Sequence, residues 1–152
     1  AIGTGAMLRE FGEDTIDAML EAIGPIPQSP SLMIQIRQNG GAIRRVPAQE
    51  TAVGDRRSAE FLTYFLGVPM GPFTPDGIVA HGQGCLRALQ PWTVAPGPLN
   101  WVGESNVPAD TIKSVFDAPT FERLHTIKRS VDPQNRFGRA GIGVWWSENQ
   151  DA

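Results

Sequence analysis

Residues 61–68, Phe-Leu-Thr-Tyr-Phe-Leu-Gly-Val, are the part of the sequence that most constrains the fold of this chain. The side chains of a strand point alternately to its two faces, and this segment is apolar at both odd and even positions and rich in aromatic residues. A segment of that kind needs cover on both faces. We therefore predict a central strand here rather than an edge strand.

A second strand is predicted at residues 31–37, because this segment alternates strictly between two sets of side chains. Leu32, Ile34 and Ile36 form one set, which we expect to pack on a core. The other set is Met33, Gln35 and Arg37. Arginine rarely enters a core without a charged partner. Judged from these residues alone, the second face simply meets solvent.

Helical periodicity and stop signals account for most of the remaining chain. Amphipathic helices are predicted at residues 13–23, 76–90, 108–116 and 119–129, and a further short strand at residues 99–103. This order of elements favours an α+β domain, an antiparallel sheet with helices packed on one face. We divide the chain into a flexible N-terminal segment (1–12), a single α+β domain of the substrate-binding type (13–146) and a C-terminal tail (147–152).

The composition excludes several classes of protein. The 152 residues are 41% apolar and 19% charged, which is typical of a globular domain, and the net charge of −3 gives no electrostatic reason to expect nucleic acid or an anionic membrane as partner. Neither a signal peptide nor a run of about 18 apolar residues is found. Cys85 is the single cysteine, so the fold has no internal disulfide, and a reducing, cytoplasmic location is expected. The chain starts without a methionine, so it need not be the whole gene product.

Motifs for phosphate or metal binding are weak. Gly3-Thr-Gly5 follows no strand and lacks the third glycine of a dinucleotide-binding turn. His81 and Cys85 are four residues apart on a predicted helix, but a zinc site needs three or four ligands and only His125 remains as an obvious third. No metal site is predicted. Cys85 as a nucleophile would need a base held by a third group, which the sequence does not indicate.

Two series of short motifs carry a family resemblance. The first consists of Ile36-Arg-Gln-Asn-Gly-Gly-Ala42, Arg45-Val-Pro-Ala48, Thr51-Ala52, Asp55-Arg56 and Phe61-Leu62. The second consists of Asn100-Trp-Val-Gly-Glu104, Thr120-Phe-Glu-Arg-Leu124, Lys128-Arg129 and Asp132-Pro-Gln-Asn-Arg-Phe137. In this order they resemble the C-terminal portion of the berberine bridge enzyme-like, FAD-linked oxidases, which belong to the vanillyl-alcohol-oxidase-like flavoproteins. The resemblance runs from about residue 31 to residue 137.

The resemblance implies a substrate-binding domain or fragment of an FAD-dependent oxidoreductase. In that family hydride passes from substrate to flavin, O2 reoxidises the flavin, and FAD is bound mainly by an N-terminal domain that this chain lacks. The chain alone is then expected to be inactive, and to self-associate through the interface it exposes. Met33, Gln35 and Arg37 would contact a small-molecule substrate, and Asn135 and Phe137 the cofactor. Tyr64 would be the catalytic base, provided that a neighbour such as Arg37 lowers its phenol pKa from about 10.

Departures from the family pattern keep other interpretations open. The residues after Phe137 are Gly138-Arg-Ala-Gly-Ile-Gly143, where relatives often place polar side chains against the flavin, and Asp55 stands where a histidine is common. One alternative is a stand-alone α+β module that binds a small ligand or a protein without redox chemistry. Another is a structural dimerisation domain, which would be favoured if Gln35, Arg37 and Tyr64 faced open solvent.

Overall fold

The computed structural model describes residues 1–45, 57–101 and 109–138. In chain order, the elements of these ranges are β1 (Ile2–Leu8), α1 (Glu13–Ile23), η1 (Ile26–Gln28), β2 (Met33–Gln38), α2 (Ala42–Arg45), β3 (Phe61–Gly67), α3 (Pro75–Ala88), η3 (Gln90–Trp92), β4 (Thr93–Pro96), η4 (Leu99–Trp101), α4 (Ala109–Ser114) and α5 (Ala118–Val131). No helix of these ranges is both long and apolar enough to cross a membrane.

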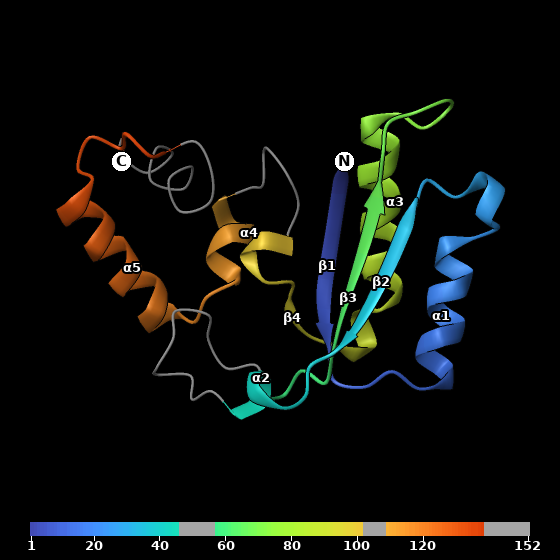
Figure 1. Cartoon of the computed structure of the whole chain (residues 1–152), viewed down its shortest axis with the longest axis horizontal. Helices are drawn as coiled ribbons and strands as arrows, with labels where there is room; N and C mark the ends of the chain where they lie inside the picture. Colours follow the sequence, from blue (N-terminus) through green and yellow to red (C-terminus); the bar gives the residue numbers. More distant parts are fainter. Residues whose placement is uncertain (46–56, 102–108, 139–152) are drawn as a thin grey trace.

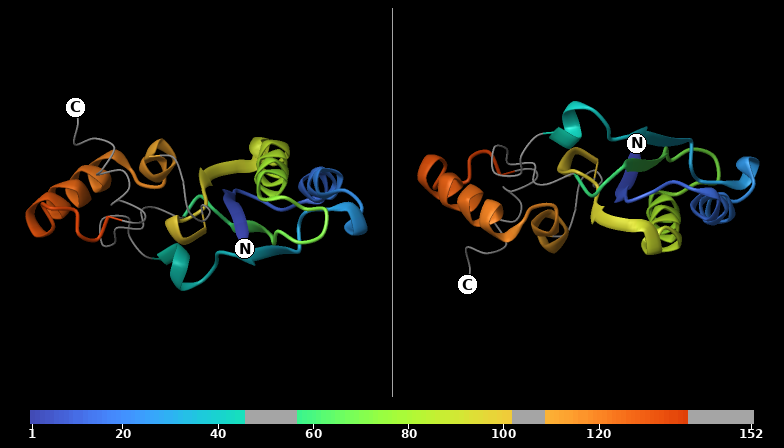
Figure 2. Two further views of the ribbon diagram at one scale, coloured as in Figure 1. Left: turned by 90° about the horizontal axis from the view of Figure 1, so that it is seen from above. Right: turned by 90° about the horizontal axis from the view of Figure 1, so that it is seen from below.

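The centre of the fold is a four-stranded antiparallel sheet in the order β2-β3-β1-β4. Helices α1 and α3 cover one face of the sheet, while α4 and α5 lie on its other side (Figures 1 and 2). The predicted α+β class is confirmed. So is the central position of residues 61–67, because β3 pairs with β1 on one side and with β2 on the other.

The main core lies between the sheet and α1 and α3. Its buried residues are Ala6, Leu8, Met19, Ile23, Phe65, Cys85 and Leu89. Helix α3 forms despite two glycines, and one of them has a packing role. A Cβ at Gly82 would lie 2.9 Å from the Thr4 side chain of β1, so the missing side chain lets the helix approach the sheet closely.

The prediction of a flexible segment at residues 1–12 is wrong for residues 2–8. These residues form β1, an internal strand that pairs with both β3 and β4. Gly3 and Gly5 remove the side chains that would have shown a strand alternation. The pairing of β1 with β3 and β4 joins residues that are far apart in the sequence, so no local sequence pattern predicts it.

The predicted strand at residues 99–103 is also wrong in its described part. Residues 99–101 form the short helix η4, and the strand of this region is β4, within the Pro-rich stretch that was predicted only to end a helix. Because β4 is an edge strand, Pro96 at its end can lack a backbone N–H without breaking the ladder.

The apolar face predicted for residues 31–37 is only partly buried. Ile34 packs against the main core, but Leu32 is 65% exposed and Ile36 is 41% exposed. The reason is topological: β2 is the last strand of the sheet, so the helix layer covers it incompletely.

Candidate functional site

The sheet face opposite α1 and α3 gathers the side chains that the sequence singled out. Met33, Gln35 and Arg37 lie on this face of β2, and the register places Gln35 directly opposite Tyr64 of β3. Directly opposite residues of an antiparallel pair share a face, so Tyr64 belongs to the same set. We call Gln35, Arg37, Tyr64 and Trp101 the open-face cluster, with Met33 at its rim, 42% exposed.

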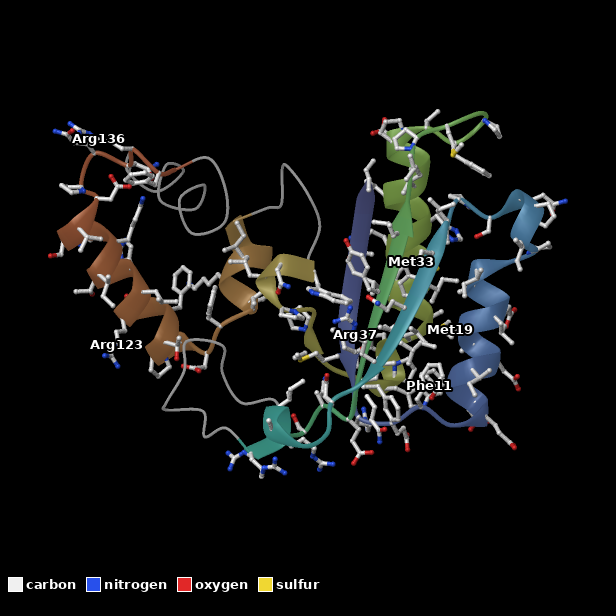
Figure 3. All side chains as sticks on the ribbon, viewed as in Figure 1. Phe11, Met19, Met33, Arg37, Arg123 and Arg136 are labelled. Atoms are coloured by element: carbon white, nitrogen blue, oxygen red, sulfur yellow. The ribbon has the colours of Figure 1, made fainter. Side chains whose placement is uncertain are left out.

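Arg37, labelled in Figure 3, contacts Trp101 and Gln35 across the face. Its guanidinium carbon lies 4.6 Å from the centroid of the Trp101 ring, a cation–π contact. With the amide oxygen of Gln35 turned towards it, the guanidinium donates hydrogen bonds of 3.0 Å from Nη2 and 3.3 Å from Nε. A positive, planar group is therefore fixed in orientation on the exposed face.

Trp101 also contacts Tyr64. The two rings meet edge to face, with centroids 4.8 Å apart and planes at 67°. The indole thus contacts the guanidinium and the phenol ring together. A cation, an amide and two aromatic rings on one surface suit a planar polar or anionic molecule.

Two glycines of β1 form the floor beneath Tyr64. A Cβ at Gly3 would collide with the Tyr64 hydroxyl, and a Cβ at Gly5 would lie 2.5 Å from the Thr63 carbonyl oxygen and 3.2 Å from the Tyr64 ring. Any larger residue at either position would push the tyrosine ring away. The Gly-Thr-Gly sequence therefore makes space for an aromatic side chain, and its backbone is engaged in the β ladder.

Sequence reasoning missed Trp101 as a site residue. The chain after β4 turns back over the sheet, where the Gly97 N–H donates to the Gly5 carbonyl (3.1 Å) and the Trp101 N–H donates to the Pro98 carbonyl (2.6 Å). A Cβ at Gly97 would lie 3.0 Å from the Gly5 oxygen, so glycine favours this close approach. The Asn-Trp-Val-Gly-Glu motif contained the tryptophan, but its place on the face depends on this tertiary turn.

The predicted cofactor-contacting residues lie elsewhere. Asn135 and Phe137 follow α5, and Figure 3 shows their neighbour Arg136 at one end of the molecule, whereas Arg37 lies near its middle. Phe137 is 84% exposed, and Asn135 adopts a left-handed backbone with φ 49°. The structure does not bring these two residues to the open-face cluster, and their contact with a cofactor stays a prediction. The loop at 46–56 and residues 139–143, which also bear on the resemblance, lie outside the described residues.

Asp132 organises the turn that contains Asn135 and Phe137. Its buried carboxylate pairs with Lys128 and accepts hydrogen bonds from the N–H groups of Arg136 (2.8 Å) and Phe137 (3.1 Å). The hydrogen bond from Lys128, helped by the two backbone N–H groups, lowers the pKa of Asp132 below its ordinary value of 3.8. The Asp-Pro-Gln-Asn-Arg-Phe motif thus has a structural role in ending α5.

The Asp132 pKa leads to a prediction about acid stability. A carboxyl with a lowered folded-state pKa binds its proton more readily when unfolded, so the stabilisation is full above about pH 4 and is lost as pH falls through the folded-state pKa. We expect the gap in Tm between the parent chain and Asp132→Asn to be largest near neutral pH and to shrink below pH 4. Thermal unfolding by circular dichroism from pH 2.5 to 7 measures this gap. A gap independent of pH would contradict it.

His81 and Cys85 form a packed polar contact. The Nε2 atom of His81 lies 3.1 Å from the Ser31 Oγ, 3.4 Å from the Ser29 Oγ and 3.7 Å from the Cys85 Sγ. Burial lowers the pKa of His81 and raises that of Cys85, which favours the neutral form of both. Nowhere in the described ranges do three potential metal ligands gather. This arrangement ties the linker before β2 to α3.

Comparison with known proteins gives a likeness of fold. No protein-family model matches the chain, and no curated protein matches it. Among solved structures, 6-hydroxy-D-nicotine oxidase from Arthrobacter nicotinovorans has a similar fold, with a TM-score of 0.55 at 22% sequence identity. The match covers 91% of this chain and 31% of the oxidase chain, so this chain spans less than a third of that protein's length.

Proposed function

We propose that this chain is the substrate-binding part of an FAD-dependent oxidoreductase. The observation that carries the proposal is the open-face cluster, where Arg37, Gln35 and Tyr64 are gathered around Trp101 on the sheet face opposite α1 and α3. Two further points support it. The sequence motifs resemble the C-terminal portion of FAD-linked oxidases, and the fold is similar to part of a solved oxidase structure.

The described residues fit one wall of a flavin site but not its phosphate-binding part. The Tyr64 and Trp101 rings and the fixed Arg37 guanidinium offer aromatic and polar contacts to a planar group. Gly3 and Gly5 lie within a paired strand and not at a helix N-terminus, so they form no phosphate cradle. FAD would therefore be held mainly by an N-terminal FAD-binding domain outside this chain. When bound, the flavin supplies hydride acceptance and reacts with O2.

Each residue of the cluster then has a defined task. Arg37 orients a polar or anionic group of the substrate, since Gln35 and Trp101 fix its guanidinium. Tyr64 is the one tyrosine of the chain, and with its hydroxyl deprotonated the phenolate oxygen takes the substrate proton and becomes the phenol. Trp101 covers Tyr64 and keeps water away from that proton.

The first test asks whether a flavin binds at all. The chain is expressed alone and together with the coding region upstream of it, and visible absorption is recorded on the purified proteins. We expect a flavin spectrum only in the joined protein. Absence of flavin there would overturn the proposal and favour a stand-alone ligand-binding module.

Tyr64→Phe tests the proposed base. The variant keeps the ring over Gly3 and Gly5 and removes only the hydroxyl. In the joined protein, we expect flavin reduction by a substrate to slow about 10²–10⁴-fold, with flavin content unchanged. Stopped-flow absorbance measures the reduction rate, and Phe61→Leu, a ring change on the other face of the same strand, is the matched control. An unchanged rate would exclude Tyr64 as the base.

A further inference from the structure

The outer edge of β2 is an open strand edge within residues 1–45, 57–101 and 109–138. β2 is the last strand of the sheet and pairs with β3 on one side only. Alternate N–H and C=O groups of such a strand point away from its neighbour. No strand within the described ranges pairs with this side, and Figure 1 shows β2 as the last arrow of the sheet on the side of α1. The edge is therefore a template for another strand.

The usual protections of an edge strand are missing here. Proteins block such edges with proline, lysine, outward charges or bulges. β2 has neither proline nor lysine, and its register with β3 is regular throughout. Its one charge, Arg37, is drawn over the sheet face by Trp101 and Gln35. Met33 and Ile36 expose 42% and 41% of their surface along the strand.

The sequence of β2 is complementary to itself. If two copies paired antiparallel about a two-fold axis through Gln35, Ile34 would lie opposite the partner's Ile36, twice by symmetry, on the helix-covered face. Met33 would lie opposite the partner's Arg37 on the other face. No like charges would be opposed, and apolar cross-strand pairs of this kind stabilise a sheet.

We propose that the β2 edge binds β2 of a second copy of this chain, which joins the two sheets into one antiparallel sheet of eight strands. This surface is distinct from the open-face cluster and needs no flavin. The competing occupant is a strand from polypeptide outside this chain, since the similar oxidase is about three times as long.

Substitution at Ile36 tests the edge. Sedimentation velocity of the 152-residue chain should show a concentration-dependent dimer. Ile36→Lys should raise its dissociation constant about tenfold, because two Ile34–Ile36 pairs are lost at about 0.2–1 kcal/mol each and a charge is placed on the edge. Val79→Lys is the matched control, since Val79 is an apolar residue of α3 with 49% exposure. A monomer at every soluble concentration, or a dimer unaffected by Ile36→Lys, would overturn the proposal.

An introduced cysteine tests the register between the two β2 strands of the proposed dimer, and its readout does not depend on the dissociation constant. Gln35→Cys places two thiols opposite each other at the symmetry axis, and oxidised glutathione should convert the dimer to a covalent one. Cys85 is fully buried and does not interfere, and Val79→Cys is the control. Equal cross-linking in both variants would contradict the register. Loss of the dimer when the upstream polypeptide is attached would assign the edge to that polypeptide instead.

Discussion

Leu8→Ala should lower the free energy of unfolding by about 2–5 kcal/mol. Leu8 ends β1 with no exposed surface and belongs to the main core between the sheet and the helices. Truncation leaves a cavity there in addition to the lost transfer free energy, because the surrounding strands cannot close around the smaller side chain.

The matched control is Leu20→Ala. Leu20 is the same residue type on α1 but is 59% exposed, so its truncation should cost less than about 0.5 kcal/mol. Urea unfolding followed by circular dichroism measures both variants under one set of conditions. Equal losses would mean that β1 is not part of the core, and the flexible segment predicted at residues 1–12 would then be restored.

Gly5→Ala should lower the free energy of unfolding by about 1–3 kcal/mol and disturb the open-face cluster. The added Cβ would lie 2.5 Å from the backbone oxygen of Thr63 on the paired strand, and backbone in a ladder cannot move aside as a flexible side chain can. It would also press on the Tyr64 ring, from which it would lie 3.2 Å away. The stability loss should therefore be accompanied by a changed near-ultraviolet circular dichroism signal from the Tyr64–Trp101 pair.

Gly40→Ala is the control for Gly5→Ala. A Cβ at Gly40 meets nothing within 4 Å, and its backbone angle φ lies outside the left-handed region. Its replacement by alanine should leave the free energy of unfolding unchanged or raise it by less than about 1 kcal/mol. The reason for any increase is that alanine lowers the conformational entropy of the unfolded chain. If Gly5→Ala behaved like Gly40→Ala in both measurements, the proposed close contact between β1 and β3 would be wrong.

The elements that could be predicted from sequence are those with a strong local pattern. Helix α1 repeats apolar residues every three to four positions, β3 is apolar on both faces, and both were placed correctly. The alternation in β2 also put Met33, Gln35 and Arg37 on one face, and the register with β3 shows Tyr64 on the same side.

Elements without such a pattern were missed. β1 contains two glycines where a typical strand has bulky residues, so its identity as an internal strand depends on pairing with β3 and β4. Trp101 was assigned to a strand, whereas a turn held by the Gly97–Gly5 hydrogen bond carries it over the sheet. Both depend on contacts between residues that are far apart in the chain.

The amino-acid sequence by itself determined the α+β class, the central place of β3 and which residues of β2 share a face. Periodicity is a local property, so it can be read without knowing any neighbour. Only the tertiary structure decided that β1 fills the middle of the sheet and that Trp101 joins Arg37 to Tyr64. Glycine has no side chain to form a pattern, and its importance here lies in the close approach that it permits between segments distant in sequence.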